Sequence, residues 1–159
     1  MLLLTVCLAQ FMVPFMLTAI GVALPSIGRD LGASAVQIGL VEQTYVLSLA
    51  MVMLTFGRLG DIVGQRIMFL IGLIAFTSLT LVIGFATSIN MIIGLRFFQG
   101  LGAATMLSGS MALVAAAYPP EQRARKIGLV SACTYVGLSA GPVIGGFITQ
   151  HFGWRHIFF

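Results

Sequence analysis

The chain has 159 residues, of which 59% are hydrophobic and only 8% are charged. Soluble domains contain about 25% charged residues, so this composition indicates a membrane protein. The formal net charge of +4 comes from basic residues scattered through the loops. No predicted span carries a basic stripe, which argues against nucleic-acid binding.

Five apolar runs are long enough for membrane-spanning helices, each of which needs about 20 mostly apolar residues. The predicted spans are residues 2–24, 37–56, 67–86, 91–117 and 127–150, and a sixth span begins at residues 155–159. The predicted fold is therefore an all-α membrane protein, a transmembrane helix bundle of five complete spans plus the start of a sixth. Because both ends of the sequence are apolar, we expect the chain to be a piece of a longer protein.

The first predicted span places Gln10, Pro14, Thr18 and Gly21 at intervals of three and four residues, so they share one helix face. The proline is expected to bend the helix. A bend and polar side chains on one stripe suit a helix that lines a water-filled cavity. Packing of this face on a neighbouring helix is an equally good interpretation.

A polar segment at residues 57–66 separates the second and third runs and carries three glycines and three charges. Backbone groups of a tight turn cannot lie in hydrocarbon, so this segment is predicted to form a loop at a membrane surface. This loop and the one at 118–126 hold Arg58, Arg66, Arg123, Arg125 and Lys126, whereas the opposite side holds Arg29 and Arg155. Basic residues in short loops stay cytoplasmic, which predicts a multi-pass protein of the cell membrane with a cytoplasmic amino terminus.

The third predicted span is apolar on all sides apart from Thr77, Ser78 and Thr80, and is expected to face lipid. The fourth contains Arg96 and Gln99, three residues apart on one face. An arginine inside a span costs at least about 2.5 kcal/mol, so it normally faces a cavity or a partner. We favour such a role over snorkelling of the side chain to the surface.

Glu42 is the only acidic residue inside a predicted span, and its expected depth in the membrane is similar to that of Arg96. We hypothesise that the two side chains pair or share a proton. The alternative is a carboxylate that reaches the surface near a helix amino terminus, where negative charge is favourable.

The fifth predicted span carries a stripe of small residues, Gly137, Gly141 and Gly145, next to Pro142 and Gly146. Such a stripe lets another helix backbone approach closely. His151 and His156 follow this span without a nearby carboxylate, so we interpret them as interfacial residues and predict no metal site.

Three signatures in this sequence resemble those of the major facilitator superfamily, over essentially the whole chain. The loop signature comprises Gly57, Leu59, Gly60, Asp61, Gly64 and Arg66, with Gln65 where the family usually has a second basic residue. The fourth-helix signature comprises Arg96, Gln99, Gly100, Gly102, Ala103 and Ala104. The fifth-helix antiporter signature comprises Gly128, Gly137, Gly141-Pro142 and Gly145-Gly146.

The end of the first span, Ala23-Leu24-Pro25-Ser26-Ile27, is similar to that of the fourteen-span drug–proton antiporter branch. Met16 stands where that branch usually has an aspartate, and Gly21 where it usually has an asparagine. The resemblance implies an amino-terminal half-domain over residues 1–159. This half would pack against a missing carboxy-terminal half around a central cavity, and the two halves would rock about that cavity.

The resemblance also implies roles for individual residues. A cytoplasmic gating loop would comprise Gly57, Arg58, Asp61, Gly64 and Arg66. Arg96 and Gln99 would respond to protonation, with Glu42, Gln10 and Thr18 as further proton-coupling or cavity residues. The stripe Gly137, Gly141, Pro142, Gly145 and Gly146 would seal a contact on the outer side or between the halves.

The implied function is proton-coupled export of hydrophobic or amphipathic organic compounds, because the expected cavity is lined by Met, Phe, Thr and Gln with hardly any fixed charge. The proton gradient would supply the energy, and no cofactor is expected. The expected partners are a small-molecule substrate, the lipid bilayer and the missing half. The alternatives are a nutrient or metabolite symporter and a non-transporting half-transporter fragment. No span carries a nucleophile–base set, which argues against an enzyme.

Overall fold

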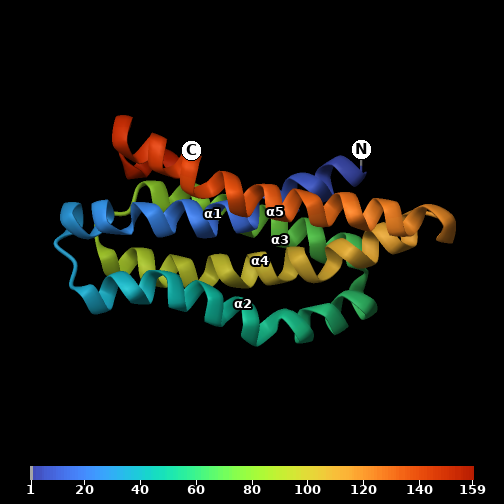
Figure 1. The fold of residues 1–159 in the computed structure, drawn as a ribbon. Coiled ribbons are helices and arrows are strands. Elements are labelled where there is room, and N and C mark those ends of the chain that lie inside the picture. The colour runs from blue at the N-terminus through green and yellow to red at the C-terminus, as the bar shows by residue number, and fades with distance from the viewer. Residues whose placement is uncertain (1) are drawn as a thin grey trace.

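The computed structural model describes residues 2–159. Its helices are α1 (Leu2–Leu31), α2 (Ala35–Val63), α3 (Gln65–Gly84), α4 (Ile89–Ala117) and α5 (Pro120–His151), followed by the short 3₁₀ helix η1 (Trp154–Phe158). Each of the five long helices is long and apolar enough to cross a membrane. The predicted all-α membrane fold is therefore confirmed, and Figure 1 shows that consecutive helices run in opposite directions along one elongated bundle.

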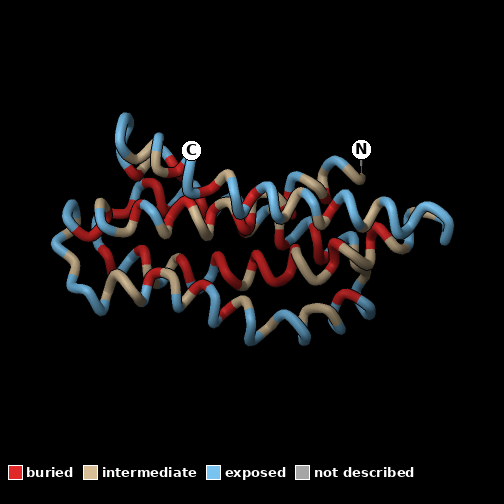
Figure 2. The backbone as a smooth tube through the Cα atoms, in the orientation of Figure 1, coloured by how far each residue is buried: buried red, intermediate tan, exposed pale blue. Residues whose placement is uncertain are grey.

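The helices pack in two groups. α1 lies along α5, while α4 lies between α2 and α3 and contacts both along its length. Contacts between the two groups are much sparser than the contacts within them. Figure 2 shows long exposed stretches on the outer faces of α2 and α5, where large apolar side chains such as Leu54 and Val143 are uncovered.

The helices extend beyond the predicted spans. α1 continues through Pro25 to Leu31, because Ile27 and Gly28 still pack in the core of the bundle. Gly32, with a φ of 61°, ends this helix. Ser34 then begins α2 with a reciprocal capping box, in which its hydroxyl accepts from the backbone N–H of Gln37 and its own N–H donates to the Gln37 side chain.

The tight reversal expected over residues 57–66 is confined to Gly64. α2 continues as far as Val63, and α3 begins at Gln65. The φ of Gly64 is 110° and its ψ is 122°, a conformation that only glycine adopts readily. The polar residues around this turn therefore stand on helix ends, and only one residue of the predicted loop is non-helical.

We expect Gly64→Ala to lower the free energy of unfolding of the intact protein by about 1–3 kcal/mol, because a side chain is disfavoured at this backbone conformation. Thermal unfolding in detergent measures the change. The matched control is Gly128→Ala, at an exposed helical position where a Cβ would meet open space. It should keep or slightly raise stability. Equal stability of the two variants would show that the turn tolerates a side chain.

The prediction that the third span faces lipid is wrong for one of its faces. Gly72, Phe76 and Thr80 of α3 are buried, and the backbone of Gly72 lies so close to α4 that a Cβ there would come within 2.6 Å of the Met106 nitrogen. The run is apolar on all sides, so its composition did not distinguish the packed face from the exposed one.

The segment predicted to begin a sixth span forms η1 in the described chain. Trp154, Ile157 and Phe158 are buried against the bundle. Arg155 Nη1 donates to Asp30 Oδ2 at 2.6 Å, and Trp154 Nε1 donates to the same oxygen at 3.0 Å. These bonds tie η1 to the carboxy-terminal end of α1.

Candidate functional site

A buried polar chain crosses the group formed by α2, α3 and α4. Arg96 of α4 is fully buried, and its Nη1 donates to Gln99 Oε1 at 2.8 Å. Gln99 Nε2 in turn donates to Thr80 Oγ1 of α3 at 2.6 Å. Arg96 Nε donates to the carbonyl oxygen of Val41 in α2 at 3.4 Å. The predicted pair of Arg96 and Gln99 thus links all three helices.

Tyr45 of α2 completes the surroundings of this arginine. The Arg96 Cζ lies 4.2 Å from the centre of the Tyr45 ring, a cation–π contact. Arg96 Nη2 and the Tyr45 hydroxyl are both buried and have no hydrogen-bond partner in the part of the chain that the structure describes. A buried polar group without a partner costs about 1–3 kcal/mol. A movement or a ligand that gave either group a hydrogen-bond partner would therefore be stabilised at this site.

The hypothesised pair of Glu42 and Arg96 does not form. Within residues 2–159 the only ion pair joins Arg155 and Asp30. Val41 and Tyr45 face α4, whereas Glu42 lies about 100° around the helix, at one residue from Val41. Its half-buried side chain lines a surface groove of about 550 Å³ with Gly39, Gln43, Val46, Leu47 and Ala50.

Glycine at position 100 accounts for the closeness of Arg96 to α2. A Cβ on Gly100 would overlap Ser48 Oγ and the carbonyl oxygen of Tyr45. The α2 and α4 backbones therefore meet one turn along α4 from Arg96. This contact brings the Val41 carbonyl and the Tyr45 ring within reach of the guanidinium.

Two adjoining cavities, of about 220 and 300 Å³, lie where the two helix groups meet. Their shared lining is Gln10, Leu107 and Thr134. The rest of the lining is Val13, Pro14, Leu17, Tyr45, Val46 and Leu49 for the smaller cavity, and Met53, Met111, Ser131 and Tyr135 for the larger. No charged side chain lines either cavity, so both are suited to uncharged, largely apolar groups.

Of the two α1 residues predicted for a cavity, the structure places one there. Gln10 lines both cavities, and its Oε1 accepts from Thr134 Oγ1 of α5 at 3.1 Å. Thr18 does not line them, because its hydroxyl is within bonding distance of the Pro14 and Phe15 carbonyls and it packs on Gly141 of α5. Tyr45 and Thr134 are not among the predicted site residues, because in the sequence only their helical spacing from polar neighbours sets them apart.

The glycine stripe of α5 packs on α1, inside this bundle. A Cβ on Gly137 would overlap the Phe11 carbonyl, one on Gly141 would overlap Thr18 Oγ1, and one on Gly145 would come within 2.7 Å of Ala19 Cα. In this structure the three glycines bring α1 and α5 together, and their predicted role in sealing a contact on the outer side or between the halves stays a prediction. Pro142 is exposed, and Gly146 lies at the edge, near Val22.

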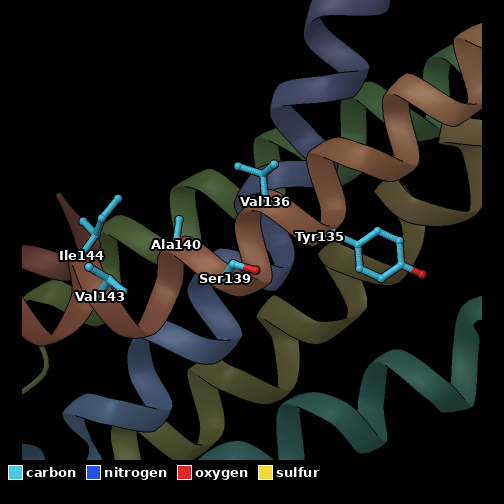
Figure 3. A pocket seen from close by; sticks show the side chains of 6 residues that line it. All are labelled: Tyr135, Val136, Ser139, Ala140, Val143 and Ile144. Carbon is cyan, nitrogen blue, oxygen red and sulfur yellow. The ribbon is translucent and has the colours of Figure 1, made fainter.

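The opposite face of α5 is open. Figure 3 shows Tyr135, Val136, Ser139, Ala140, Val143 and Ile144 along one side of the helix, where they line a shallow apolar hollow of about 530 Å³. The Tyr135 side chain extends from α5 toward the space over α4 and α2 (Figure 3). It lines the larger cavity as well, so the hollow and the cavity meet at this residue.

At the α2–α3 turn, a side-chain hydrogen bond is formed by Gln65, which is not among the predicted gating residues. Gln65 Nε2 donates to Asp61 Oδ1 at 2.7 Å and lies 3.4 Å from the Gly57 carbonyl oxygen. Arg58 and Arg66 are exposed and form no hydrogen bond or ion pair with any residue in the described range 2–159. The structure thus brings together Gly57, Asp61 and Gln65, and leaves both arginines available to other partners.

Five helices long and apolar enough to cross a membrane, packed around small uncharged cavities, indicate an integral membrane protein. The sequence model of the Major Facilitator Superfamily matches residues 6–159. The chain belongs to this superfamily, and the predicted resemblance is confirmed.

Known proteins similar to this chain include several exporters. It is 36% identical over 157 residues to the tetracenomycin C resistance and export protein of Streptomyces glaucescens, covering 99% of this chain and 29% of that protein. It is 33% identical to the riboflavin transporter RibZ of Clostridioides difficile, covering 98% of this chain and 34% of that protein. It is also 36% identical to the multidrug resistance protein Stp of Mycobacterium tuberculosis, covering 96% of this chain and 28% of that protein. The chain thus spans about a third or less of the length of these relatives.

A solved structure shares the fold. The bacterial homologue of the human lysosomal transporter Spinster, in an inward-facing and unoccupied conformation, superposes with a TM-score of 0.84 at 22% identity. The match covers 99% of this chain and 38% of that chain.

Proposed function

We propose that this chain is the amino-terminal half-domain of a proton-coupled exporter of hydrophobic or amphipathic organic compounds. The observation that carries the proposal is the pair of uncharged cavities, the smaller of which is lined by Tyr45. The Tyr45 ring contacts Arg96, a buried cation without a carboxylate partner in the described chain. The tetracenomycin C export protein and the multidrug resistance protein Stp, both similar to this chain, support export as the direction.

In this proposal the remainder of a longer protein covers the exposed apolar faces. The hollow on α5 and the groove on α2 lie on opposite helix groups, at the two sides of the cavities. A second half seated on both would close the cavities and could alternate their access between the two membrane faces. The Gly57–Arg66 turn would face the cytoplasm, where Arg58 and Arg66 would bond to the second half in only one of the two states.

Arg96 would couple this motion to protonation. Its free Nη2 offers a donor to an ionised carboxylate, and protonation of that carboxylate would weaken the bond. Glu42 is our candidate for the proton carrier within this chain, because it neighbours Val41, whose carbonyl accepts from Arg96. A shift of α2 that moves Val41 and Tyr45 would change the surroundings of both charged groups.

The test is substrate-induced proton movement by the full-length protein in vesicles. With an imposed pH gradient and a pH-sensitive dye, addition of a transported hydrophobic compound should dissipate the gradient in wild type. Transport that proceeds equally well without a gradient would contradict proton coupling.

A metabolite transporter is the second candidate, favoured by the similarity to the riboflavin transporter RibZ. The two candidates differ in their substrates. Proton-driven movement of riboflavin together with a failure to move any hydrophobic drug-like compound would support the second and contradict the first.

A further inference from the structure

The Gln10 side chain has the properties of a ligand-binding group. It is only 6% exposed and lines both cavities. The Thr134 hydroxyl donates to Gln10 Oε1 at 3.1 Å, across the α1–α5 contact. The same hydroxyl also lies 3.4 Å from the Val130 carbonyl oxygen. With Gln10 Oε1 accepting from Thr134, Nε2, which only donates, is turned the other way. Within residues 2–159, the only hydrogen bond of the Gln10 side chain is the one that Oε1 accepts from Thr134.

The surroundings of this free donor restrict what it can bind. The smaller cavity is walled by Val13, Leu17, Leu49 and Leu107 and by the Tyr45 ring, and the larger by Met53 and Met111. An ion placed here would lose its hydration without meeting an opposite charge. A fully apolar ligand would leave the Gln10 amide without a partner, which also costs free energy. The best match is a neutral compound with one acceptor oxygen on an apolar frame.

A purely structural role explains less of the geometry. Hydrogen bonds between membrane helices average about 0.6 kcal/mol, and the Thr134–Gln10 bond could serve only to join α5 to α1. That role requires the Oε1 contact alone. It does not account for the place of the Gln10 amide in the lining of two cavities, where its Nε2 forms no hydrogen bond within residues 2–159.

We propose that Gln10 Nε2, oriented by Thr134, forms a subsite that recognises a carbonyl oxygen of a neutral, largely apolar compound. This inference rests on the proposed export function and names the substrate class of the same cavity. Gln10 would contact the substrate directly, and Thr134 would be a positioning residue that acts through Gln10.

The test uses two neutral planar probes that differ in one group, fluorenone with a carbonyl and fluorene without it. Equilibrium binding of each radiolabelled probe to the purified full-length protein should show a preference for fluorenone. Gln10→Leu should weaken fluorenone binding about five- to tenfold, as expected for one lost hydrogen bond, and should leave fluorene binding nearly unchanged. Fluorene binding also reports whether the variant is folded.

Three further variants separate positioning from packing. Thr134→Val should reduce the preference for fluorenone, Thr134→Ser should restore it, and Gln10→Leu with Thr134→Val should be no worse than Gln10→Leu alone. The matched control is Ser131→Ala, one turn away on α5 in the same cavity lining, which should keep the preference. A preference retained in Gln10→Leu, or an equal loss of both probes, would overturn the subsite.

The outcomes also separate this inference from the proposed function. Wild-type protein that prefers fluorenone through Gln10 but moves no protons would keep the subsite and contradict proton-coupled export. Protein that exports other compounds with proton movement but binds both probes equally, or neither, would keep export and overturn the subsite.

Discussion

Replacing Arg96 with methionine should lower substrate-induced proton movement by the full-length transporter about tenfold or more, while the protein still folds. Hydrogen bonds to a charged group contribute about 1.5–3 kcal/mol, so bonds formed by Arg96 in only one state would shift the state populations by about that factor. Methionine fills a similar volume without a buried charge, although it leaves Gln99 Oε1 without its donor, which costs about 1–3 kcal/mol of folding free energy. Vesicle assays measure the rate, and thermal unfolding in detergent measures folding.

Two companion variants sharpen this result. Arg96→Lys keeps the charge but cannot bond to Gln99 and Val41 with the planar geometry of the guanidinium, so it should recover only part of the rate. Arg29→Met removes an exposed arginine whose Nε contacts only the Pro25 carbonyl, and it should behave as wild type. Normal proton movement in a folded Arg96→Met protein would mean that Arg96 serves structure alone.

Gly100→Leu should prevent α2 from packing on α4 and abolish accumulation of the folded protein. Even a Cβ at this position would overlap Ser48 Oγ and the Tyr45 carbonyl, and a leucine would separate the two backbones. Overpacking a well-packed core typically costs about 1–3 kcal/mol, and a clash with backbone lies at or above the upper end of that range. Size-exclusion chromatography of a fluorescent fusion of the full-length protein measures the loss.

The matched control for this prediction is Gly94→Leu. It lies in the same helix, but a Cβ there would meet nothing within 4 Å. This variant should accumulate and migrate as wild type does. A similar loss in both variants would trace the effect to leucine in α4 generally and contradict the close-contact explanation.

Sequence reasoning predicted the helices better than their ends. The five apolar runs predicted five helices because the hydrocarbon core sets a minimum length, but it sets no maximum. α1 therefore continues past the predicted end at Leu24, and Ser34 with Gln37 marks the start of α2 through capping chemistry that hydropathy does not record. Arg96 could be selected from the sequence because a charge inside a span is costly wherever it points.

The sequence does not show which residues contact the predicted site residues. A glycine stripe indicates that some backbone comes close, but it does not say which helix supplies that backbone, and in α5 the helix is α1. Tyr45 precedes its partner Arg96 by 51 positions and has the sequence surroundings of an ordinary apolar helix residue. Gln65 replaces a residue that is usually basic, and its bond to Asp61 became visible only once the helix ends were placed.

The division of the helices into two groups has a mechanical consequence. Glycine contacts join α1 to α5 and α4 to α2 and α3, while the cavities lie along the seam between these units. Fewer contacts join the two units, among them Gly28 of α1 against Ile38 of α2, so a movement along the seam would change the cavities and leave the glycine contacts inside each unit intact. A cross-link between α1 and α4 would then lock the cavity volume, whereas one between α1 and α5 would leave it adjustable.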